Sequence, residues 1–382
     1  MKILFCSAST NLTTGYAKIS AQILNTLAQF HDVWHLAFQS DNADNINRKI
    51  DPSITVLPDK DFGASRLLGH VDRIEPDVVM VYNDVIVCHN YCRLLEDRKC
   101  RFIVYLDLTY EYQNWVVEIS DGCDLLLCFH ETWMKHVIDM GVPASKARYV
   151  DHPPPQISAA PLDPRVFGFS SEDFVVLNLN RNSYRKFNDI TLDGFIRFFK
   201  SRGCPPNIKL FLGCKFQFTG TYDIPKLITH FSKLHGLTDK EHDTLINKSI
   251  VRFKTDSVSD DVVHQLYQSC TVGLNTTGGE GYGLCNIEHQ LYGKPQIVTG
   301  INNFYEFFSP LSTYFLQPQT RICIPPELDV VGGVIDIPCA QDVARGLEFY
   351  YDHPNIRNQH GQEGMEFLKN RNNNFKDLMD II

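Results

Sequence analysis

The sequence has little positive charge and no long apolar run. Its 382 residues include 36 Lys and Arg against 45 Asp and Glu, so the formal net charge at pH 7 is −9. A dedicated nucleic-acid-binding protein usually has the opposite balance, and we therefore expect no nucleic-acid partner. No apolar stretch reaches the roughly 20 residues of a membrane-spanning helix, so we expect no transmembrane segment, although this leaves peripheral membrane contact open.

The N-terminal segment also lacks the apolar stretch of a secretory signal. MKILFCSASTNLTTG turns polar after the short run Ile3–Cys6, which predicts a first β-strand. We expect a cytoplasmic protein in which the 12 cysteines stay reduced and serve as core residues. Cys88, His89 and Cys92 have a spacing compatible with zinc, but no second pair of ligands follows, so packing is the expected role of these side chains.

Strand-like and helical patterns alternate along the chain, which predicts parallel sheets built from strand–helix–strand units. A chain of 382 residues is too long for one ordinary core and favours two domains. Five prolines in residues 152–165 predict a linker between them. We thus expect an α/β protein with two Rossmann-like, doubly wound domains. The predicted ranges are 1–151, the linker 152–165, a second domain 166–360, and a helical tail 361–382 that could pack back on the first domain.

The expected elements follow from the same patterns. Strands are predicted at 2–6, 32–38, 53–57, 77–82, 102–106, 125–129, 147–150, 173–180, 208–213, 249–253, 271–275 and 295–299. Helices are predicted near 15–30, 86–98, 131–141, 187–202, 224–245, 260–269 and 284–293, and through most of the chain from 340. Ligands of such sheets bind beyond the carboxyl ends of the strands, so function is expected in the loops that follow strands.

The loop after the first predicted strand is rich in small and polar residues and leads into a helix near Gly15. Unpaired N–H groups at a helix start form an anion site, which would suit a phosphate. An ordinary strand-to-helix turn capped by Thr13 or Thr14 explains the same pattern equally well. The G-x-G-x-x-G fingerprint of dinucleotide-binding domains is absent here, which disfavours a dehydrogenase.

Arg181, Arg185 and Lys186 form a basic cluster just after the predicted strand 173–180. The planar fork of arginine and the compact charge of lysine together suit a diphosphate. The alternative is a solvated basic helix start, but positive charge there opposes the helix dipole. We therefore favour a functional role for the cluster.

The stretch NTTGGEGYGLCNIEHQLYGKP, residues 275–295, places four glycines around Glu280 in a loop and Glu288 in the helix that follows. Glycine loses much conformational entropy on folding, but it lets a ligand press against main-chain N–H groups. Carboxylates accept hydrogen bonds from sugar hydroxyls. A plain glycine-rich turn with an acidic helix start would account for Glu288 but not for the glycines.

These motifs resemble the signature of the retaining glycosyltransferases of family 4, which have the GT-B fold. EGYGLCNIEHQLYGKPQIV is similar to the family's E-G-F-G-L-x-x-x-E-A-x-A-x-G-x-P-V-V, and Arg181 with Lys186 matches its R-x4-K. LYQSCTVGLNTT resembles the run that leads into the two-glutamate motif, and CDLLLCFHETWMKHVIDMGVPASKARYVDHPPP resembles the stretch before the family's linker. The resemblance covers most of the chain in the family's order.

The resemblance implies a role for each matching residue. Glu280 would lie beside the transferred sugar, and Arg181 and Lys186 would stabilise the diphosphate in place of a metal ion. Glu288 would bind the ribose hydroxyls. The remaining donor-binding residues would be Gly15, Val251, Arg252, Phe253, Gly281, Tyr282, Gly283 and Leu284. No metal and no cofactor are expected, and the nucleotide-diphosphate sugar is a substrate.

Asp107 is the main departure from the family's pattern. Many members have a histidine just after the strand that here lies in FIVYLDLTYEY, and Asp107 is its nearest equivalent, which we assign as a catalytic residue. An ionised Asp can accept a hydrogen bond from a sugar hydroxyl but cannot donate one. His289 stands where the family usually has alanine, and Phe187 where it usually has glycine.

The resemblance further implies metal-independent transfer of a hexose with retention at the anomeric carbon. The second domain would bind the donor, for which we predict GDP-mannose, and the first domain would bind the acceptor, a glycan or glycoprotein hydroxyl. The aromatic segment 110–115 could stack on a sugar face, or it could be a partly buried loop. Two alternatives stay open: a nucleotide-sugar epimerase of the same fold, and a non-catalytic sugar-nucleotide-binding protein.

Overall fold

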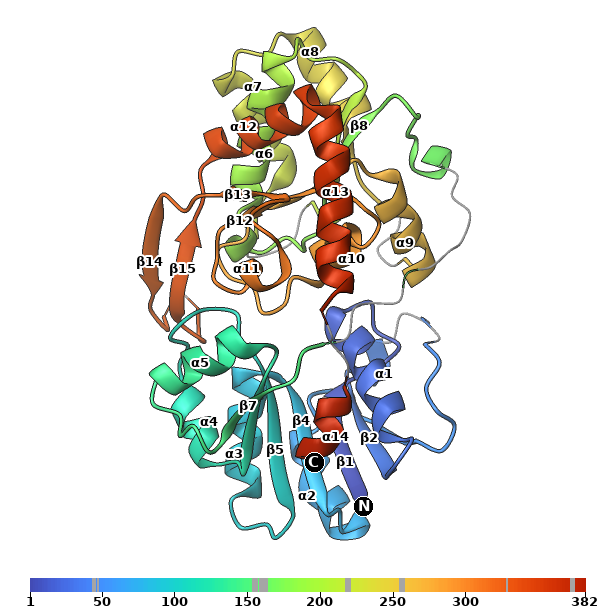
Figure 1. The fold of residues 1–382 in the computed structure, drawn as a ribbon, viewed down its shortest axis with the longest axis vertical. Coiled ribbons are helices and arrows are strands. Elements are labelled where there is room, and N and C mark those ends of the chain that lie inside the picture. The colour runs from blue at the N-terminus through green and yellow to red at the C-terminus, as the bar shows by residue number, and fades with distance from the viewer. Residues whose placement is uncertain are drawn as a thin grey trace. The chain divides into compact units, whose positions relative to one another are not determined.

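A computed structural model describes residues 1–42, 46, 48–152, 157, 164–216, 221–253, 258–327, 329–371 and 375–382. The chain divides into two units, and Figure 1 labels most of their elements. Unit 1 contains Met1–Pro153, Cys323–Val334 and Asn372–Ile382, and unit 2 contains Pro154–Ile322 and Ile335–Arg371. The predicted linker 152–165 lies almost wholly outside the described residues.

Unit 1 is built on a parallel sheet. Within the described residues, seven strands pair in the order β3-β2-β1-β4-β5-β6-β7, and all neighbours are parallel. The strands are β1 (Lys2–Ala8), β2 (Asp32–Phe38), β3 (Thr55–Pro58), β4 (Val78–Asp84), β5 (Arg101–Asp107), β6 (Leu125–Cys128) and β7 (Ala147–Tyr149). The helices are α1 (Gly15–Leu27), α2 (Ala64–Ile74), α3 (Val85–Leu95), α4 (Val116–Asp121), α5 (Glu131–Asp139) and α14 (Lys376–Ile381).

Local sequence explains where these elements begin. β4 has the sequence VVMVYND and is buried from Val78 to Asn83, which is typical of a parallel strand covered on both faces. α1 begins after Thr14, whose Oγ1 accepts a hydrogen bond from the Ala17 N–H at 3.2 Å. Asp84 caps α3 in the same way. The small polar residues that follow the strands therefore start the helices.

Unit 2 repeats this design. In its described part, six parallel strands pair in the order β10-β9-β8-β11-β12-β13. The strands are β8 (Phe174–Asn178), β9 (Ile208–Leu212), β10 (Ile250–Val251), β11 (Val272–Asn275), β12 (Gln296–Thr299) and β13 (Thr313–Leu316), with β14 (Thr320–Ile324) and β15 (Gly333–Ile337) as a separate pair. The helices are α6 (Asn188–Ser201), α7 (Ile224–Leu234), α8 (Asp239–Thr244), α9 (Asp260–Ser269), α10 (Leu284–Gln290), α11 (Phe304–Phe307), α12 (Ala340–Asp352) and α13 (Pro354–Lys369).

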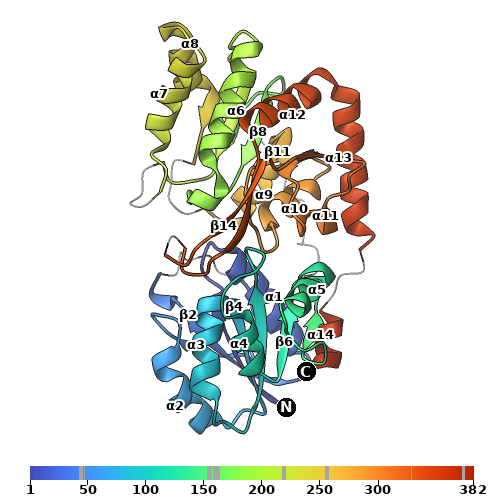
Figure 2. The ribbon, with the colours of Figure 1, turned by 90° about the vertical axis from the view of Figure 1, so that its left-hand side faces the viewer.

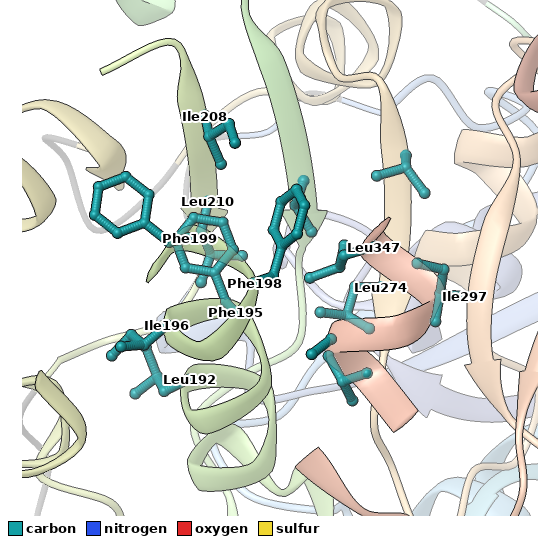
Figure 3. Packing of buried hydrophobic residues seen from close by; sticks show 14 of the residues in the cluster. Leu192, Phe195, Ile196, Phe198, Phe199, Ile208, Leu210, Leu274, Ile297 and Leu347 are labelled. Carbon is teal, nitrogen blue, oxygen red and sulfur yellow. The ribbon is translucent and has the colours of Figure 1, made fainter. Parts of the chain in front are cut away.

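The largest apolar core of unit 2 lies between α6 and the sheet. α6 contributes five buried side chains, namely Leu192, Phe195, Ile196, Phe198 and Phe199. Figure 3 shows them beside the strand residues of β9, β11 and β12 and beside Leu347 of α12. Helices α6 and α12 pack side by side, as Figure 2 also shows.

The opposite face of this sheet has its own cluster. Val176 belongs to the α6 core, whereas its neighbours Val175 and Leu177 pack with Leu266 and Tyr267 of α9. Successive side chains of a strand point to opposite faces, so α6 and α9 cover different faces of the sheet. Unit 2 is therefore a three-layer α/β unit.

Both sheets have a switch point, where neighbouring strands are far apart in sequence. These points lie between β1 and β4 in unit 1 and between β8 and β11 in unit 2. Ligands of open α/β sheets bind outside the carboxyl ends of the strands at such points. The loops after β8 and β11 contain the basic cluster and the glycine-rich stretch, so both motifs lie at the switch point of unit 2.

Some elements differ from the sequence-based prediction. Helix α2, helix α4 and strands β13, β14 and β15 were not expected. The strands and α4 are short, with at most six residues each, whereas α2 has 11 residues and a helical spacing of buried side chains that the prediction overlooked. The predicted boundary between 360 and 361 falls inside α13, which continues to Lys369. In the described part of the chain, no helix is both long and apolar enough to cross a membrane.

The segment Cys323–Val334, predicted as part of the second domain, groups with unit 1. The Val334 N–H donates to the Glu111 carbonyl at 2.8 Å, and the Asn114 N–H donates to the Val331 carbonyl at 2.9 Å. These are main-chain bonds, which leave no characteristic side-chain pattern in the sequence. The grouping could therefore only be found in the structure.

Candidate functional site

The basic loop and the glycine-rich loop of unit 2 are joined by hydrogen bonds to the main-chain carbonyls of the basic loop. The Gly278 N–H donates to the Arg185 carbonyl at 2.9 Å. The Thr276 hydroxyl lies 2.9 Å from the Lys186 carbonyl and 3.0 Å from the Phe187 carbonyl. Two loops that follow β8 and β11 are thereby held as one surface at the switch point.

Glu280 is the centre of a charge cluster on this surface. Its Oε2 contacts the Lys186 ammonium, and it lies 3.5 Å from Nη1 of Arg185. The same Arg185 Nη1 donates to the Gly279 carbonyl at 2.5 Å, which fixes the guanidinium against the loop. The side chain of Lys186 is 5% exposed and that of Glu280 16%, so the pair is screened much less than a surface ion pair. The cluster holds two positive charges against one negative charge.

Gly278 and Gly283 are required by packing. A Cβ at Gly278 would lie 2.4 Å from Cγ1 of Ile335 and 2.6 Å from Cε2 of Phe187. Gly283 has a φ of +83°, and a Cβ there would lie 2.5 Å from Cε1 of Phe304. Ligand contact was the predicted role of these glycines, but at these two positions side chains of the protein itself fill the space.

Glu288 lies on α10, behind the glycine-rich loop. It is 3% exposed, and its Oε2 accepts a hydrogen bond from the Tyr267 hydroxyl of α9 at 2.8 Å. Burial, followed by the charges of Cys285 and Glu288, raises the pKa of Tyr267 well above its usual value. Tyr267 therefore remains a donor, and it fixes the orientation of the Glu288 carboxylate.

The other predicted donor-binding residues of unit 2 lie in neighbouring loops. Arg181 is exposed on the loop after β8. The Arg252 guanidinium lies 4.6 Å from the ring centre of Phe216, and the Phe253 ring packs 4.8 Å from that of Phe211. Val251 ends β10. Strands β8, β9 and β10 are neighbours, so these segments share one edge of the sheet.

The residues that follow Glu280 are largely packed within unit 2. Tyr282 is 7% exposed, and its ring contacts that of Phe307 at 4.6 Å. The Gly281 carbonyl accepts from Nδ2 of Asn303 at 3.3 Å. Leu284 is the first residue of α10. The side chain of Tyr282 is thus a core contact, which leaves its main chain for the predicted ligand contact.

In unit 1, Gly15 is exposed at the start of α1. The turn capped by Thr14, one of the two explanations of this loop, is present. Nη1 of Arg48 donates to the Thr10 carbonyl at 2.7 Å and to the Leu12 carbonyl at 2.5 Å. The loop therefore has a positive charge against it, which is compatible with an anion at the helix start.

Asp107 ends β5 and lies opposite Asp84 of β4 in the strand register. Its Oδ2 accepts a hydrogen bond from the Tyr16 hydroxyl, one residue beyond Gly15. Burial, and then the charges of Asp107 and Asp84, raises the pKa of Tyr16 well above its usual value. The structure thus brings together Asp107 and the residue next to Gly15 at the switch point of unit 1.

Sequence reasoning missed several members of these clusters. Arg185 was named in the basic cluster but not among the predicted catalytic residues, because the R-x4-K motif matches only Arg181 and Lys186. Tyr267 and Tyr16 were not named, since each contacts its carboxylate across the fold. Among the described residues, no three His, Cys, Asp or Glu side chains come together as a possible metal site.

No protein-family model and no curated protein sequence matches the chain. Solved structures match it over nearly its whole length. Sucrose-phosphate synthase from Thermosynechococcus elongatus has a TM-score of 0.73 at 12% identity, covering 100% of this chain and 97% of its own. HepE from Anabaena, in complex with UDP-glucose, has a TM-score of 0.64 at 14% identity and coverages of 97% and 95%. The UDP-forming α,α-trehalose-phosphate synthase from Burkholderia xenovorans, in complex with glucose-6-phosphate, has a TM-score of 0.67 at 11% identity and coverages of 100% and 98%.

The fold is GT-B. The sheets of units 1 and 2 are the two Rossmann-like halves of this GT-B protein, which confirms the predicted fold class. The Lys186–Glu280–Arg185 cluster occupies the switch point of the second half, and the Tyr16–Asp107 pair that of the first.

Proposed function

We propose that the protein is a metal-independent, retaining glycosyltransferase, which moves a hexose from a nucleotide-diphosphate sugar to a hydroxyl of a glycan or glycoprotein. The observation that carries the proposal is the contact of Glu280 with both Lys186 and Arg185 at the switch point of unit 2. A site for a diphosphate leaving group needs fixed positive charge, and a sugar needs a carboxylate acceptor beside it. This cluster supplies both in one place.

In the proposed reaction, the cations stabilise the charge that develops on the leaving diphosphate. Lys186 and Arg185 are held by Glu280, and Arg181 adds a third positive charge from the same loop. Positive charges that are fixed before the reaction need no reorganisation during it, which lowers the barrier. The diphosphate leaves from the face that the acceptor hydroxyl then approaches, and its oxygen accepts the hydroxyl proton. The anomeric configuration is therefore retained.

Other residues have proposed roles in binding. Glu288, oriented by Tyr267, accepts hydrogen bonds from the ribose, and the main chain of residues 281–284 contacts sugar or phosphate. Residues 251–253 lie near the base. In unit 1, Gly15 is assigned to the phosphate and Asp107 to a sugar hydroxyl. The Tyr16 hydroxyl donates a hydrogen bond to Oδ2 of Asp107, which restricts the rotation of that carboxylate.

The donor class is a nucleotide-diphosphate hexose. GDP-mannose was predicted from the donors most common in the resembling family and not from a particular residue of this sequence. The structure of HepE contains UDP-glucose, which makes uridine and glucose the rival choice. Both donors therefore belong in the first experiment.

The first experiment is a thermal-shift screen of the purified protein with GDP, UDP, ADP and their mannose and glucose conjugates. A ligand that binds only the folded state at 100 times its Kd stabilises that state by about 2.7 kcal/mol. For a unit of this size the midpoint should then rise by about 5 °C or more. One responding nucleotide would identify the base.

The second step is product analysis with the responding donor, in buffer containing EDTA. Transfer to a glycan with the donor's anomeric configuration supports the proposal. Conversion of the sugar without acceptor would instead identify an epimerase. Binding without any turnover would identify a non-catalytic binding protein, and activity that EDTA removes and metal restores would refute metal independence.

A further inference from the structure

Four buried carboxamides of unit 2 form a continuous hydrogen-bond chain, in which each side chain donates to the next. They are 0–7% exposed and come from the loop after β8, the end of β11, α10 and the start of β12: Asn180, Asn275, Asn286 and Gln296. Primary amides are rarely buried unless their donors and acceptors are satisfied, because an unpaired group costs about 1–3 kcal/mol. Their arrangement therefore needs a complete set of partners.

The chain runs in one direction. Nδ2 of Asn180 donates to Oδ1 of Asn275 at 3.0 Å, and Nδ2 of Asn275 donates to Oδ1 of Asn286 at 2.9 Å. Nδ2 of Asn286 donates in turn to Oε1 of Gln296 at 2.9 Å. Nε2 of Gln296 then lies 3.2 Å from Nδ1 of His289. Hydrogen bonds aligned head to tail polarise one another, so such a chain is stronger than separate bonds.

His289 is suited to end the chain as an acceptor. Burial, together with the charge of Lys294, lowers the pKa of His289 to about 3, so the ring is neutral and Nδ1 can accept. This residue stands where the resembling family usually has alanine. Its place at the end of the chain gives that departure a physical reason.

Asn275 connects all three segments of the proposed site. Its Oδ1 accepts from Asn180, on the loop that continues into the basic cluster, and also from the Thr277 N–H of the glycine-rich loop at 3.0 Å. Its Nδ2 bonds to Asn286 of α10, two residues before Glu288. A single carboxamide, 1% exposed, is therefore bonded to the segments that carry Lys186, Glu280 and Glu288.

Packing alone would not select these residues. Apolar side chains of similar volume would fill the same space without a directional requirement, and cores tolerate such exchanges. Directional bonds, in contrast, fix the distance and the angle between the segments that they join. An error of about 1 Å in the position of a catalytic group can lower a rate on the order of 10²-fold.

We propose that Asn275 is a positioning residue, which sets the placement of the Glu280 loop relative to the basic loop and to α10. The inference rests on the proposed function for its catalytic consequence, but the link between the segments can be measured without turnover. Asn275 does not touch the substrate in this role and acts through the segments to which it is bonded.

The test compares Asn275→Leu with Gln290→Met. Gln290 is an equally buried amide on α10 and is 1% exposed. It does not belong to the hydrogen-bond chain and donates instead to the carbonyls of Phe307 at 3.2 Å and Gly364 at 3.0 Å. Both variants lose two or more buried bonds, so both should lower the melting temperature. Hydrogen exchange of the main-chain amides is the first readout, and kcat and nucleotide Kd with the identified donor are the second.

Asn275→Leu should raise exchange in residues 276–283 and in α10 together, and should lower kcat on the order of tenfold to hundredfold. Its nucleotide Kd should change by less than about fivefold, because Tyr267 still orients Glu288. Gln290→Met should leave exchange in 276–283 unchanged and kcat within about twofold. The inference is overturned if the two variants show the same exchange pattern, or if kcat of Asn275→Leu stays within twofold of wild type.

Asn275→Asp is the second variant, for the case that Asn275→Leu does not fold. It keeps the acceptor for Asn180 and Thr277 and removes the donor to Asn286, so increased exchange should be confined to α10. Unchanged exchange in α10 would contradict the inference. If the wild-type protein turns over no donor, the proposed function has failed, and the exchange result still decides whether Asn275 links the segments.

Discussion

Acidification should destabilise unit 1 through His152. This side chain is 1% exposed, and its ring lies 4.5 Å from that of Phe129, 5.4 Å from that of Tyr105 and 5.9 Å from that of Phe375. Burial among these rings lowers the pKa of His152 to about 3. In the unfolded chain the pKa returns to its ordinary value of about 6.5.

The sign of the effect follows from this difference. Above pH 6.5 both states are neutral and the stability is fully present, whereas below pH 6.5 the unfolded state binds a proton that the folded state does not. Each pH unit below 6.5 then costs about 1.4 kcal/mol, so the loss between pH 7.5 and pH 5.0 is about 2 kcal/mol. His35, buried with a pKa lowered to about 4, should add a loss of about the same size.

The assay uses the position of the tryptophans. All 3 of them, Trp34, Trp115 and Trp133, belong to unit 1, so their fluorescence reports the unfolding of this unit. Urea unfolding of wild type and of His152→Phe is compared at pH 7.5 and pH 5.0. The variant should lose about 2 kcal/mol less than wild type between these values. An equal pH dependence of the two proteins would refute the reasoning.

Further predictions concern unit 2. Glu280→Gln should lower turnover on the order of hundredfold with a small change in nucleotide Kd, and full activity would remove Glu280 from the mechanism. Tyr267→Phe should weaken nucleotide binding severalfold in calorimetry, because one hydrogen bond to a charged group contributes about 1.5–3 kcal/mol and only part of it is lost on binding; an unchanged Kd would contradict the role of Glu288. Phe195→Ala in the α6 core should reduce the free energy of unfolding by about 3–5 kcal/mol in a denaturant titration, and a loss below 1 kcal/mol would be inconsistent with the packing described.

Much of the fold could be predicted because the parallel strands are nearly continuous apolar runs. β2 was predicted at its observed bounds, 32–38, and β8 within a few residues. The order of motifs placed the basic and glycine-rich loops after two strands, and the switch point between β8 and β11 explains why these loops meet. Local patterns thus indicated where chemistry could lie.

What could not be predicted depends on contacts between distant segments. The hydroxyl of Tyr267 reaches Glu288, and that of Tyr16 reaches Asp107, but no spacing in the sequence encodes either pair. Asn275 looked like an ordinary residue at a strand end, and its three partners became visible only with the fold. The glycine at 278 was given a ligand-contact role because the side chain that fills the space, Ile335, is distant in the sequence.

The assignment of three separate chain segments to unit 1 has a consequence for the order in which the protein folds during its synthesis. Residues 1–153 are translated before unit 2, but unit 1 also contains Cys323–Val334 and Asn372–Ile382. From the last of these, Phe375 is 4% exposed and Leu378 0%, and Nη1 of Arg101 donates to the Ile382 carbonyl at 2.7 Å. Until Asn372–Ile382 is translated, the N-terminal part of unit 1 lacks the side chains of Phe375 and Leu378, which are buried in the complete protein. Unit 1 is thus begun before unit 2 and completed after it.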